Sequence, residues 1–286
     1  MSLTLASNLL SLRAQTALQR STSDLAKAYE RASSGLRINK GSDDSAGLAL
    51  ADTLKSQSAM LGVASRNTND GISFASLADS GLQEITNILG RMAELATQGA
   101  NSTYTTSQRS AFQSELSYLG SEVDRIVNTL SFNSQAILTG NSPSIQVGYD
   151  NTANSRISIG GVTANLSALS LGTGPSLTFS IYNSSTDTLY TSITASRAAY
   201  TAINSAIDSI TVKRGTVTGN LSRLQSALNY ITVTRENLMS AEANTRNTDV
   251  AQDAAEILRL QILQQAQTSL LAQANQNQSL VLQLLQ

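Results

Sequence analysis

Residues 112–130, FQSELSYLGSEVDRIVNTL, place apolar side chains at alternating intervals of four and three residues. The series consists of Phe112, Leu116, Leu119, Val123, Ile126 and Leu130. An average spacing of 3.5 residues puts all six on one narrow stripe of an α-helix, which is how helices pack when they lie nearly parallel in a coiled-coil-like bundle. The stretch therefore predicts a long helix packed against other long helices.

The same spacing extends through most of the chain. It links fourteen positions between Leu50 and Ala96, eleven of them apolar, and it recurs from Val217 to Ile231. Residues 42–44, Ser-Asp-Asp, precede the longest series and provide an N-cap and favourable charge for a first helical turn. We expect a mainly α fold, a long coiled-coil-like helical bundle built from both ends of the chain.

The middle of the chain is different. It contains the only two prolines, Pro143 and Pro175, and apolar residues there alternate with a period of two. The alternation runs through 145–149 and 157–159 on either side of a turn-rich stretch, which predicts a small β-hairpin. A second, weaker hairpin is predicted from Phe179 and Ile181 through a turn at 183–187 to Leu189 and Ile193.

Composition excludes several classes of protein. The chain has no Cys, His or Trp, and its 19 basic and 20 acidic residues nearly cancel. These features argue against disulfides, a metal site, a cofactor, catalysis and nucleic-acid binding. The last 27 residues carry no charge, but nine Gln and two Asn make them too polar for membrane insertion. No cleaved secretory leader is recognisable at the start, so any export is expected to use another route.

The two ends complement each other. Residues 1–40 have a net charge of +4 and residues 247–286 a net charge of −2, so two weakly apolar helices of opposite charge are expected to pair. Their stripes run towards both chain ends, and other copies of the chain in an open head-to-tail array would bury them. The alternative is a hairpin that caps a monomer. The candidate subunit-assembly residues are Leu3, Leu10, Leu18, Leu25, Leu263, Leu270, Ala274, Val281 and Leu284.

Four motifs resemble bacterial flagellin. They are SGLRIN at 34–39 followed by DDSAG at 43–47, the RMAELATQ segment at 91–98, QVG at 146–148, and ILQQA at 262–266 followed by LAQANQ at 271–276. Together, in this order and at these distances from both ends, they are highly specific, and the resemblance covers about residues 1–160 and 195–286.

The resemblance implies a compact filament subunit with little or no outer domain. Its expected organisation is an N-terminal inner-tube helix (1–40), N-terminal rod helices (41–140), a rod hairpin (141–160), a short variable, surface-exposed segment (161–194), a C-terminal rod helix (195–246) and a C-terminal inner-tube helix (247–286).

The implied function is structural. Subunits would be secreted by the flagellar export route and would polymerise outside the cell into a filament for swimming motility. The implied partners are other copies of the chain, an export chaperone bound through the C-terminal tail, and the filament cap and hook-associated proteins. The alternative is a hook–filament junction protein, which shares the same ends.

The resemblance also implies a receptor-binding surface. Arg91, Leu95, Gln98 and Glu115 match positions at which an animal innate immune receptor, Toll-like receptor 5, contacts flagellin monomers. An exposed Arg beside a partly buried Leu would suit such a contact. The run 67–71, Asn-Thr-Asn-Asp-Gly, lacks the opening and closing acids of a calcium loop and is not expected to bind metal.

Overall fold

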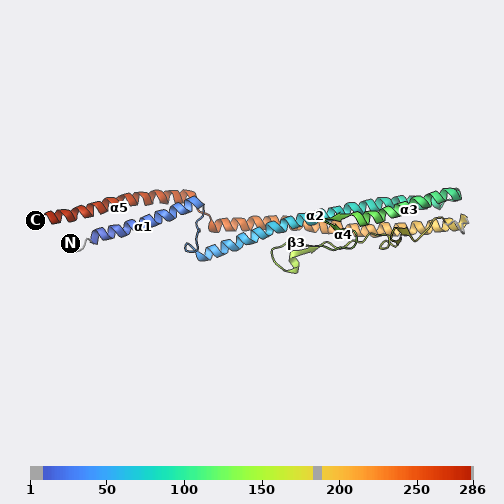
Figure 1. The fold of residues 1–286 in the computed structure, drawn as a ribbon, viewed down its shortest axis with the longest axis horizontal. Helices are drawn as coiled ribbons and strands as arrows, with labels where there is room; N and C mark the ends of the chain where they lie inside the picture. The colour runs from blue at the N-terminus through green and yellow to red at the C-terminus, as the bar shows by residue number, and fades with distance from the viewer. Residues whose placement is uncertain (1–8, 183–188, 285–286) are drawn as a thin grey trace. The chain divides into compact units, whose positions relative to one another are not determined.

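The computed structural model describes the backbone of residues 9–182 and 189–284, and the side chains of residues 9–182 and 191–276. The chain forms two compact units, one from residues 1–58 and 236–286 and the other from residues 59–235. The helices are α1 (Leu9–Ser34), α2 (Ser45–Gly99), α3 (Thr106–Thr129), α4 (Leu189–Arg246) and α5 (Val250–Leu284), with one 3-10 turn at Ala153–Ser155 (Figure 1). The strands are β1 (Ser131–Phe132), β2 (Gln135–Ala136), β3 (Ser144–Gln146), β4 (Arg156–Ser158), β5 (Gly172–Thr173) and β6 (Ser176–Leu177). The predicted mainly α fold is confirmed.

Local signals fix the ends of the long helices. The Asp44 carboxylate accepts hydrogen bonds from the backbone N–H groups of Ala46 and Gly47, at 3.1 and 2.9 Å, which makes it the N-cap of α2. Thr105 and Gln108 form a reciprocal capping box at the start of α3. The buried Arg109 guanidinium donates to the backbone carbonyls of Gly99 and Asn101, so a cation lies against the C-terminal carbonyls of α2.

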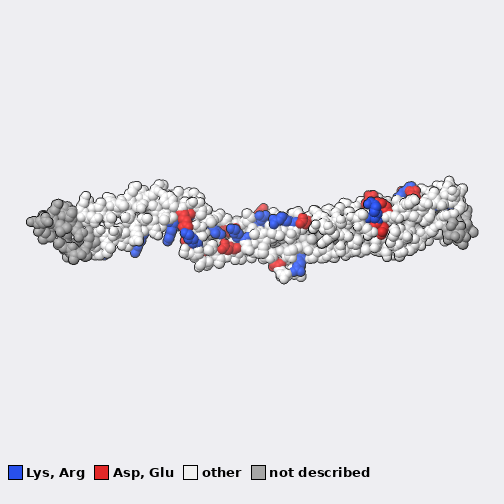
Figure 2. Space-filling view, viewed as in Figure 1, with Lys and Arg blue, Asp and Glu red and all other residues white. Residues whose placement is uncertain are grey.

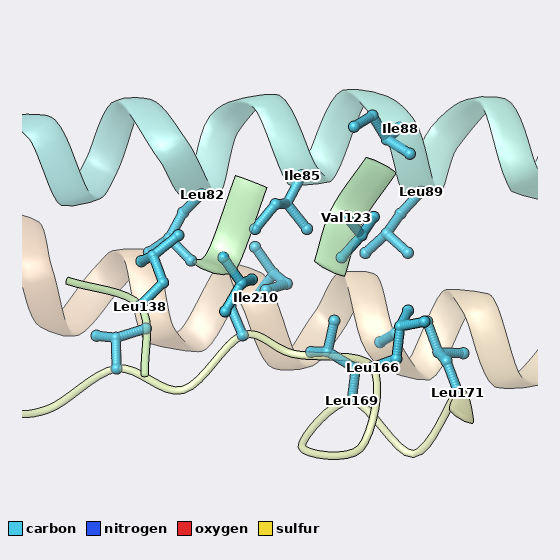
Figure 3. Packing of buried hydrophobic residues seen from close by; sticks show 14 of the residues in the cluster. Leu82, Ile85, Ile88, Leu89, Val123, Leu138, Leu166, Leu169, Leu171 and Ile210 are labelled. Carbon is cyan, nitrogen blue, oxygen red and sulfur yellow. The ribbon is translucent and has the colours of Figure 1, made fainter. Parts of the chain in front are cut away.

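The core of the 59–235 unit lies where α2, α3 and α4 pack together. Leu82, Ile85 and Leu89 of α2 meet Val123 of α3 and Ile210 of α4, and all five are buried (Figure 3). An ion pair between Asp79 and Arg214, 2.9 Å long, also joins α2 to α4. The six residues of the 112–130 stripe all belong to this core or pack against it, so the stripe predicted the buried face of α3 correctly.

The first predicted hairpin is confirmed. Strands β3 and β4 pair antiparallel, with Ile145 opposite Ile157. Two smaller antiparallel pairs, β1–β2 and β5–β6, flank it in the chain. In the β1–β2 turn both Asn133 and Ser134 have positive φ, +48° and +63°.

Two expectations for the middle of the chain are wrong. The second hairpin does not form: β5 and β6 lie earlier in the chain, and Leu189 and Ile193 belong to α4. Its expected turn, 183–187, lies outside the described residues. The segment 161–194 is not simply a surface segment, since several of its apolar side chains lie in the core, with Leu166, Leu169 and Leu171 on a loop against the helices (Figure 3). These side chains follow no helix or strand period, so periodicity did not reveal their burial. The buried apolar residues of this segment are Val162, Ala164, Leu166, Leu169, Leu171 and Ile181.

In the other unit, α1 and α5 lie side by side (Figure 1). Gly35, at φ +70°, ends α1, and its backbone N–H donates to the Arg31 carbonyl at 2.8 Å. The chain then crosses the α4–α5 connection: the Arg37 N–H donates to the Arg246 carbonyl at 2.7 Å, and the Thr248 N–H donates to the Gly35 carbonyl at 3.1 Å. These two backbone bonds tie the first arm of the chain to the last.

Candidate assembly and recognition surfaces

The seam between α1 and α5 is largely polar. Its hydrogen bonds join Ser11 to Asn275 at 3.1 Å, Gln264 to Thr22 at 3.3 Å and Gln261 to the Tyr29 hydroxyl at 2.6 Å. Ser21 also donates to the Gln267 side-chain carbonyl. Among the described side chains, the apolar core of this hairpin is confined to Leu25, Ala28 and Leu260, with Ile257 partly buried against them. Over their described side chains, the two helices therefore bury little apolar area against each other.

Large apolar side chains point outward from the hairpin instead. On α1, Leu9, Leu10 and Leu12 are 55–63% exposed. On α5, Leu258, Ile262 and Leu270 are 60–66% exposed. Several large apolar side chains exposed on one element are typical of a protein–protein contact site, so these side chains are candidates for contact with other protein copies.

The predicted assembly residues divide into three groups. Leu10, Leu263 and Leu270 are exposed, whereas Leu18 and Ala274 are half-buried and Leu25 is buried in the seam. Leu3 lies outside the described residues, and Val281 and Leu284 lie in α5 where side chains are not described.

The apolar series predicted for α5 is divided between two faces of the helix. The α5 positions that are buried or half-buried from Ile257 onward are Ile257, Leu260, Gln261, Gln264, Gln267, Leu271 and Ala274, whereas Leu263 and Leu270 of the predicted series are exposed. Sequence analysis did not select the exposed Leu9, Leu12, Leu258 and Ile262, although leucines lying off the stripe were a visible signal.

A buried carboxylate links the start of α5 to the end of α1. Asp253 is 5% exposed, and one of its oxygens accepts two hydrogen bonds from the Arg31 guanidinium, at 3.0 and 2.9 Å. The other oxygen accepts a hydrogen bond of 2.6 Å from the Thr248 hydroxyl. The bond from Thr248, followed by the hydrogen bond and charge of Arg31, holds the pKa of Asp253 below its usual value. This contact was not predicted from the sequence.

The predicted receptor residues lie on α2 and α3 in the other unit. The Arg91 guanidinium, which is exposed, donates to the Glu115 carboxylate at 2.9 and 2.8 Å and to Glu94 at 2.9 Å. These bonds, that to Glu94 first, raise the pKa of Arg91. Gln98 is half-buried, whereas Leu95 is only 1% exposed. Leu95 therefore supports this surface from the core and is not the partly buried anchor that its place beside Arg91 suggested.

The described residues hold no group of three or more acidic, His or Cys side chains that could bind a metal ion. The calcium-like run at 67–71 is an uninterrupted part of α2. Among the residues described, no helix is long and apolar enough to span a membrane.

These features define a class of protein: an α-helical structural protein with a closed core in one unit and outward-facing leucines in the other. The family model described as "Bacterial flagellin N-terminal helical region" matches residues 5–142, and the model described as "Bacterial flagellin C-terminal helical region" matches residues 200–285. The chain belongs to the bacterial flagellin family, and it is a structural subunit of the flagellar filament and not an enzyme.

Known relatives agree with this assignment. The chain is 34% identical to a flagellin of Halalkalibacterium halodurans over 91% of each chain. It is 33% identical to the "Flagellar filament 33 kDa core protein" of Treponema phagedenis, over 97% of this chain and 98% of that one. A solved structure of Bacillus cereus flagellin is similar at 25% identity, with a TM-score of 0.47, over 62% of this chain and 94% of the other. The first two relatives align with this chain over 91% and 98% of their own lengths.

Proposed function

We propose that the α1/α5 hairpin is the part of the subunit through which neighbouring copies contact each other in the filament. The observation that carries this proposal is the contrast between a polar seam and outward-facing leucines. An apolar side chain gains burial energy only against a partner, and α1 and α5 leave theirs uncovered. In an open helical array, each hairpin would cover the leucines of the next.

Export follows from the same proposal. Subunits would leave the cell through the flagellar export route and assemble outside it, as the likeness to named filament proteins suggests. Before assembly, the outward leucines of α5 would need cover, and an export chaperone could take them as a helix in an apolar groove. Cap and hook-associated proteins would meet the same hairpin at the two ends of the filament.

The test is to replace Leu263 and Leu270 together by Gln in the full chain. These side chains lie off the α1 seam, so the hairpin should still form while purified subunits no longer polymerise in a sedimentation assay. A matched control replaces the exposed Ser226 and Thr232 of α4 by Gln. Normal polymers from the leucine variant would contradict the proposal.

Electron microscopy of the wild-type polymer separates the two flagellar alternatives. A filament subunit forms long tubes from purified protein. A hook–filament junction protein would form only short oligomers, and that outcome would replace the filament assignment.

A second proposal concerns the Arg91 surface: Toll-like receptor 5 recognises it in the monomer. It is supported by an exposed guanidinium held by Glu94 and Glu115, since Arg is enriched among residues that dominate interfaces. Arg91→Ala should weaken receptor binding about tenfold or more, while Glu115→Ala should do less.

The control for this second proposal is Arg125→Ala. Arg125 is also exposed and is also paired with a glutamate three residues away, Glu122, at 2.5 Å. Equal binding by the Arg91 and Arg125 variants would show that the receptor contacts another surface. Because Leu95 is buried, any effect of Leu95→Ala must be checked against the stability of the unit.

A further inference from the structure

A shallow groove of about 670 Å³ runs along α1, and all the residues that line it belong to this helix. They form two rows with a spacing of four residues. One row is polar and consists of Gln15, Gln19 and Ser23, and the other consists of Leu18, Thr22 and Ala26. Since residues four apart are neighbours on a helix surface, the two rows are the walls of the groove.

The exposed face of α5 has two rows of similar composition, which we call its outer rows. The first is apolar and again has a spacing of four: Leu258, Ile262, Ala266 and Leu270. The second lies beside it and is polar: Gln265, Ser269 and Gln273. All seven side chains are exposed. The outer rows therefore repeat, on α5, the combination of side chains that lines the α1 groove.

Both faces stay uncovered when the hairpin forms. On α5, Gln264 meets α1 in the seam, and Ile262 is two residues earlier, which turns it about 160° away around the helix. On α1, the groove begins at the edge of the seam, because Thr22 both lines it and accepts the bond from Gln264. Ala26 lies five residues after Ser21 of the seam, about 140° around the helix.

No charge opposes contact between these two faces. Neither the groove lining nor the outer rows include a charged residue. In Figure 2 the visible surface of the hairpin next to the grey atoms at the left is white apart from isolated blue. The seam itself is made from the same side chains, with Ser21 bonded to Gln267 and Gln264 to Thr22. The chemistry that joins α1 to α5 within one chain is therefore available to join them between two.

The two faces also match in position along the hairpin. The helices run antiparallel, and Ser21 lies level with Gln267. Five residues forward on α1 and five back on α5 bring Ala26 level with Ile262. The same count pairs the rest of the two faces, row with row: Leu18 with Leu270, Thr22 with Ala266, Gln15 with Gln273, Gln19 with Ser269 and Ser23 with Gln265. Two hairpins at one height would thus place polar residues against polar ones and the apolar row of α5 against Leu18, Thr22 and Ala26.

We infer that the outer rows of α5 in one copy pack into the α1 groove of a second copy, with the two hairpins parallel and at the same height. The inference rests on the proposal that the hairpins mediate assembly, and it names the surface that covers Leu258, Ile262 and Leu270. The contact joins two different surfaces, so each copy keeps one groove and one set of outer rows for further copies. Such a contact extends into an open array and does not close into a dimer.

Cysteine cross-linking of the full chain tests this contact, because the sequence has no cysteine of its own. Ala26→Cys with Ile262→Cys puts two thiols on faces that point apart within one hairpin and meet between copies. Polymers of this variant, treated with a mild oxidant, should give a ladder of linked multimers on a non-reducing gel. The control is Lys27→Cys with Ile262→Cys, which moves one thiol about 100° around α1 and out of the groove, and it should give no ladder.

A second pair of variants tests the packing without oxidation. Ala26→Trp fills the groove at a position that is exposed in the single chain, so circular dichroism should show an unchanged hairpin. Its critical concentration for polymerisation should rise about tenfold or more, because bulk inserted into a packed contact is costly. Lys27→Trp, at the neighbouring exposed position, should have a much smaller effect.

A ladder as strong for the Lys27 control as for the Ala26 variant, or none for either, would overturn the inference. So would a stronger ladder from Ala26→Cys with Ala266→Cys, which would mean that the hairpins are shifted by about one turn. If the cysteine variant does not polymerise, the Trp variants decide, and equal critical concentrations would overturn the inference.

Failure of the proposed function has a different signature. Normal polymers from the chain with Leu263 and Leu270 both replaced by Gln would reject the hairpin as the assembly region, whatever the cross-links show. Loss of those polymers, together with no ladder from the Ala26 and Ile262 cysteines, would keep the assembly region and reject this contact alone.

Discussion

The two units of this flagellin differ in how their apolar side chains are buried. In the 59–235 unit, residues from α2, α3, α4 and the 161–182 segment bury one another in a continuous core. Among the described side chains of the α1/α5 hairpin, three form the buried apolar core, and leucines of the same size face outward. The comparison shows that similar heptad-like stripes are buried to different extents, since one unit closes its core and the other leaves large apolar side chains exposed.

Removing residues 260–286 should reveal the difference between the two units most clearly. Polymerisation should be abolished, because α1 loses its partner and the outward face of α5 is lost. The core of the 59–235 unit contains none of these residues and should keep its thermal transition, measured by circular dichroism. A truncated chain that still forms filaments would remove the distinction between the units.

A leucine-to-alanine substitution should lower the free energy of unfolding strongly in one unit and hardly at all in the other. Leu82→Ala, at a fully buried position, should cost about 2–5 kcal/mol in the free energy of unfolding of the 59–235 unit. Leu270→Ala should leave monomer stability within about 0.5 kcal/mol, because its side chain is 64% exposed. Chemical denaturation of the two variants measures both values, and equal losses would contradict the comparison.

Asp253→Asn should weaken the hairpin by about 1–2 kcal/mol, because the substitution removes a charge-assisted contact with Arg31. The folded pKa of Asp253 lies below its unfolded value, so this contribution is complete above about pH 4 and is lost as the pH falls through the lowered pKa. The variant should therefore lack this acid-dependent loss. Helicity of α1 and α5 as a function of pH, with Asp24→Asn as the control, is the measurement.

The smallest expected effect is a gain in the closed unit. Ser134 has φ +63° in the β1–β2 turn, where a side chain is strained and glycine is not. Ser134→Gly should raise the stability of the 59–235 unit by about 0.5–1 kcal/mol. Lower stability in thermal unfolding would show that the serine side chain makes a compensating contact.

Sequence periodicity predicted the helices and the buried face of α3 because one side of each stripe is polar. It also predicted the β3–β4 hairpin, whose Ile145 and Ile157 alternate with polar residues. It failed for the buried leucines of 161–182, because an irregular segment has no period to detect and its burial is set by the helices it packs on.

The face of α5 that meets α1 shows a second limit of prediction from the sequence. Apolar residues lie on several sides of this helix, so spacing alone could not decide which ones meet α1. In the structure the seam takes Gln264 and Gln267, and leaves Leu263 and Leu270 outside. The Arg31–Asp253 contact was unpredictable for a related reason, since it joins residues 222 positions apart through side chains that any exposed helix could carry.

The pairing of early with late residues has a consequence for the time course of folding. The 59–235 unit needs residues near both its limits, as the contact between Asp79 and Arg214 shows, and the hairpin needs residues as far apart as Ser21 and Gln267. Such long-range contacts form late and slowly, because a large loop must close before any of them is made. A chain that becomes available from its N-terminus can complete the 59–235 unit only after residue 235 has appeared, and the hairpin only after most of α5 has followed. Under the proposed export, the 59–235 unit therefore completes its core before the hairpin that we propose joins copies together.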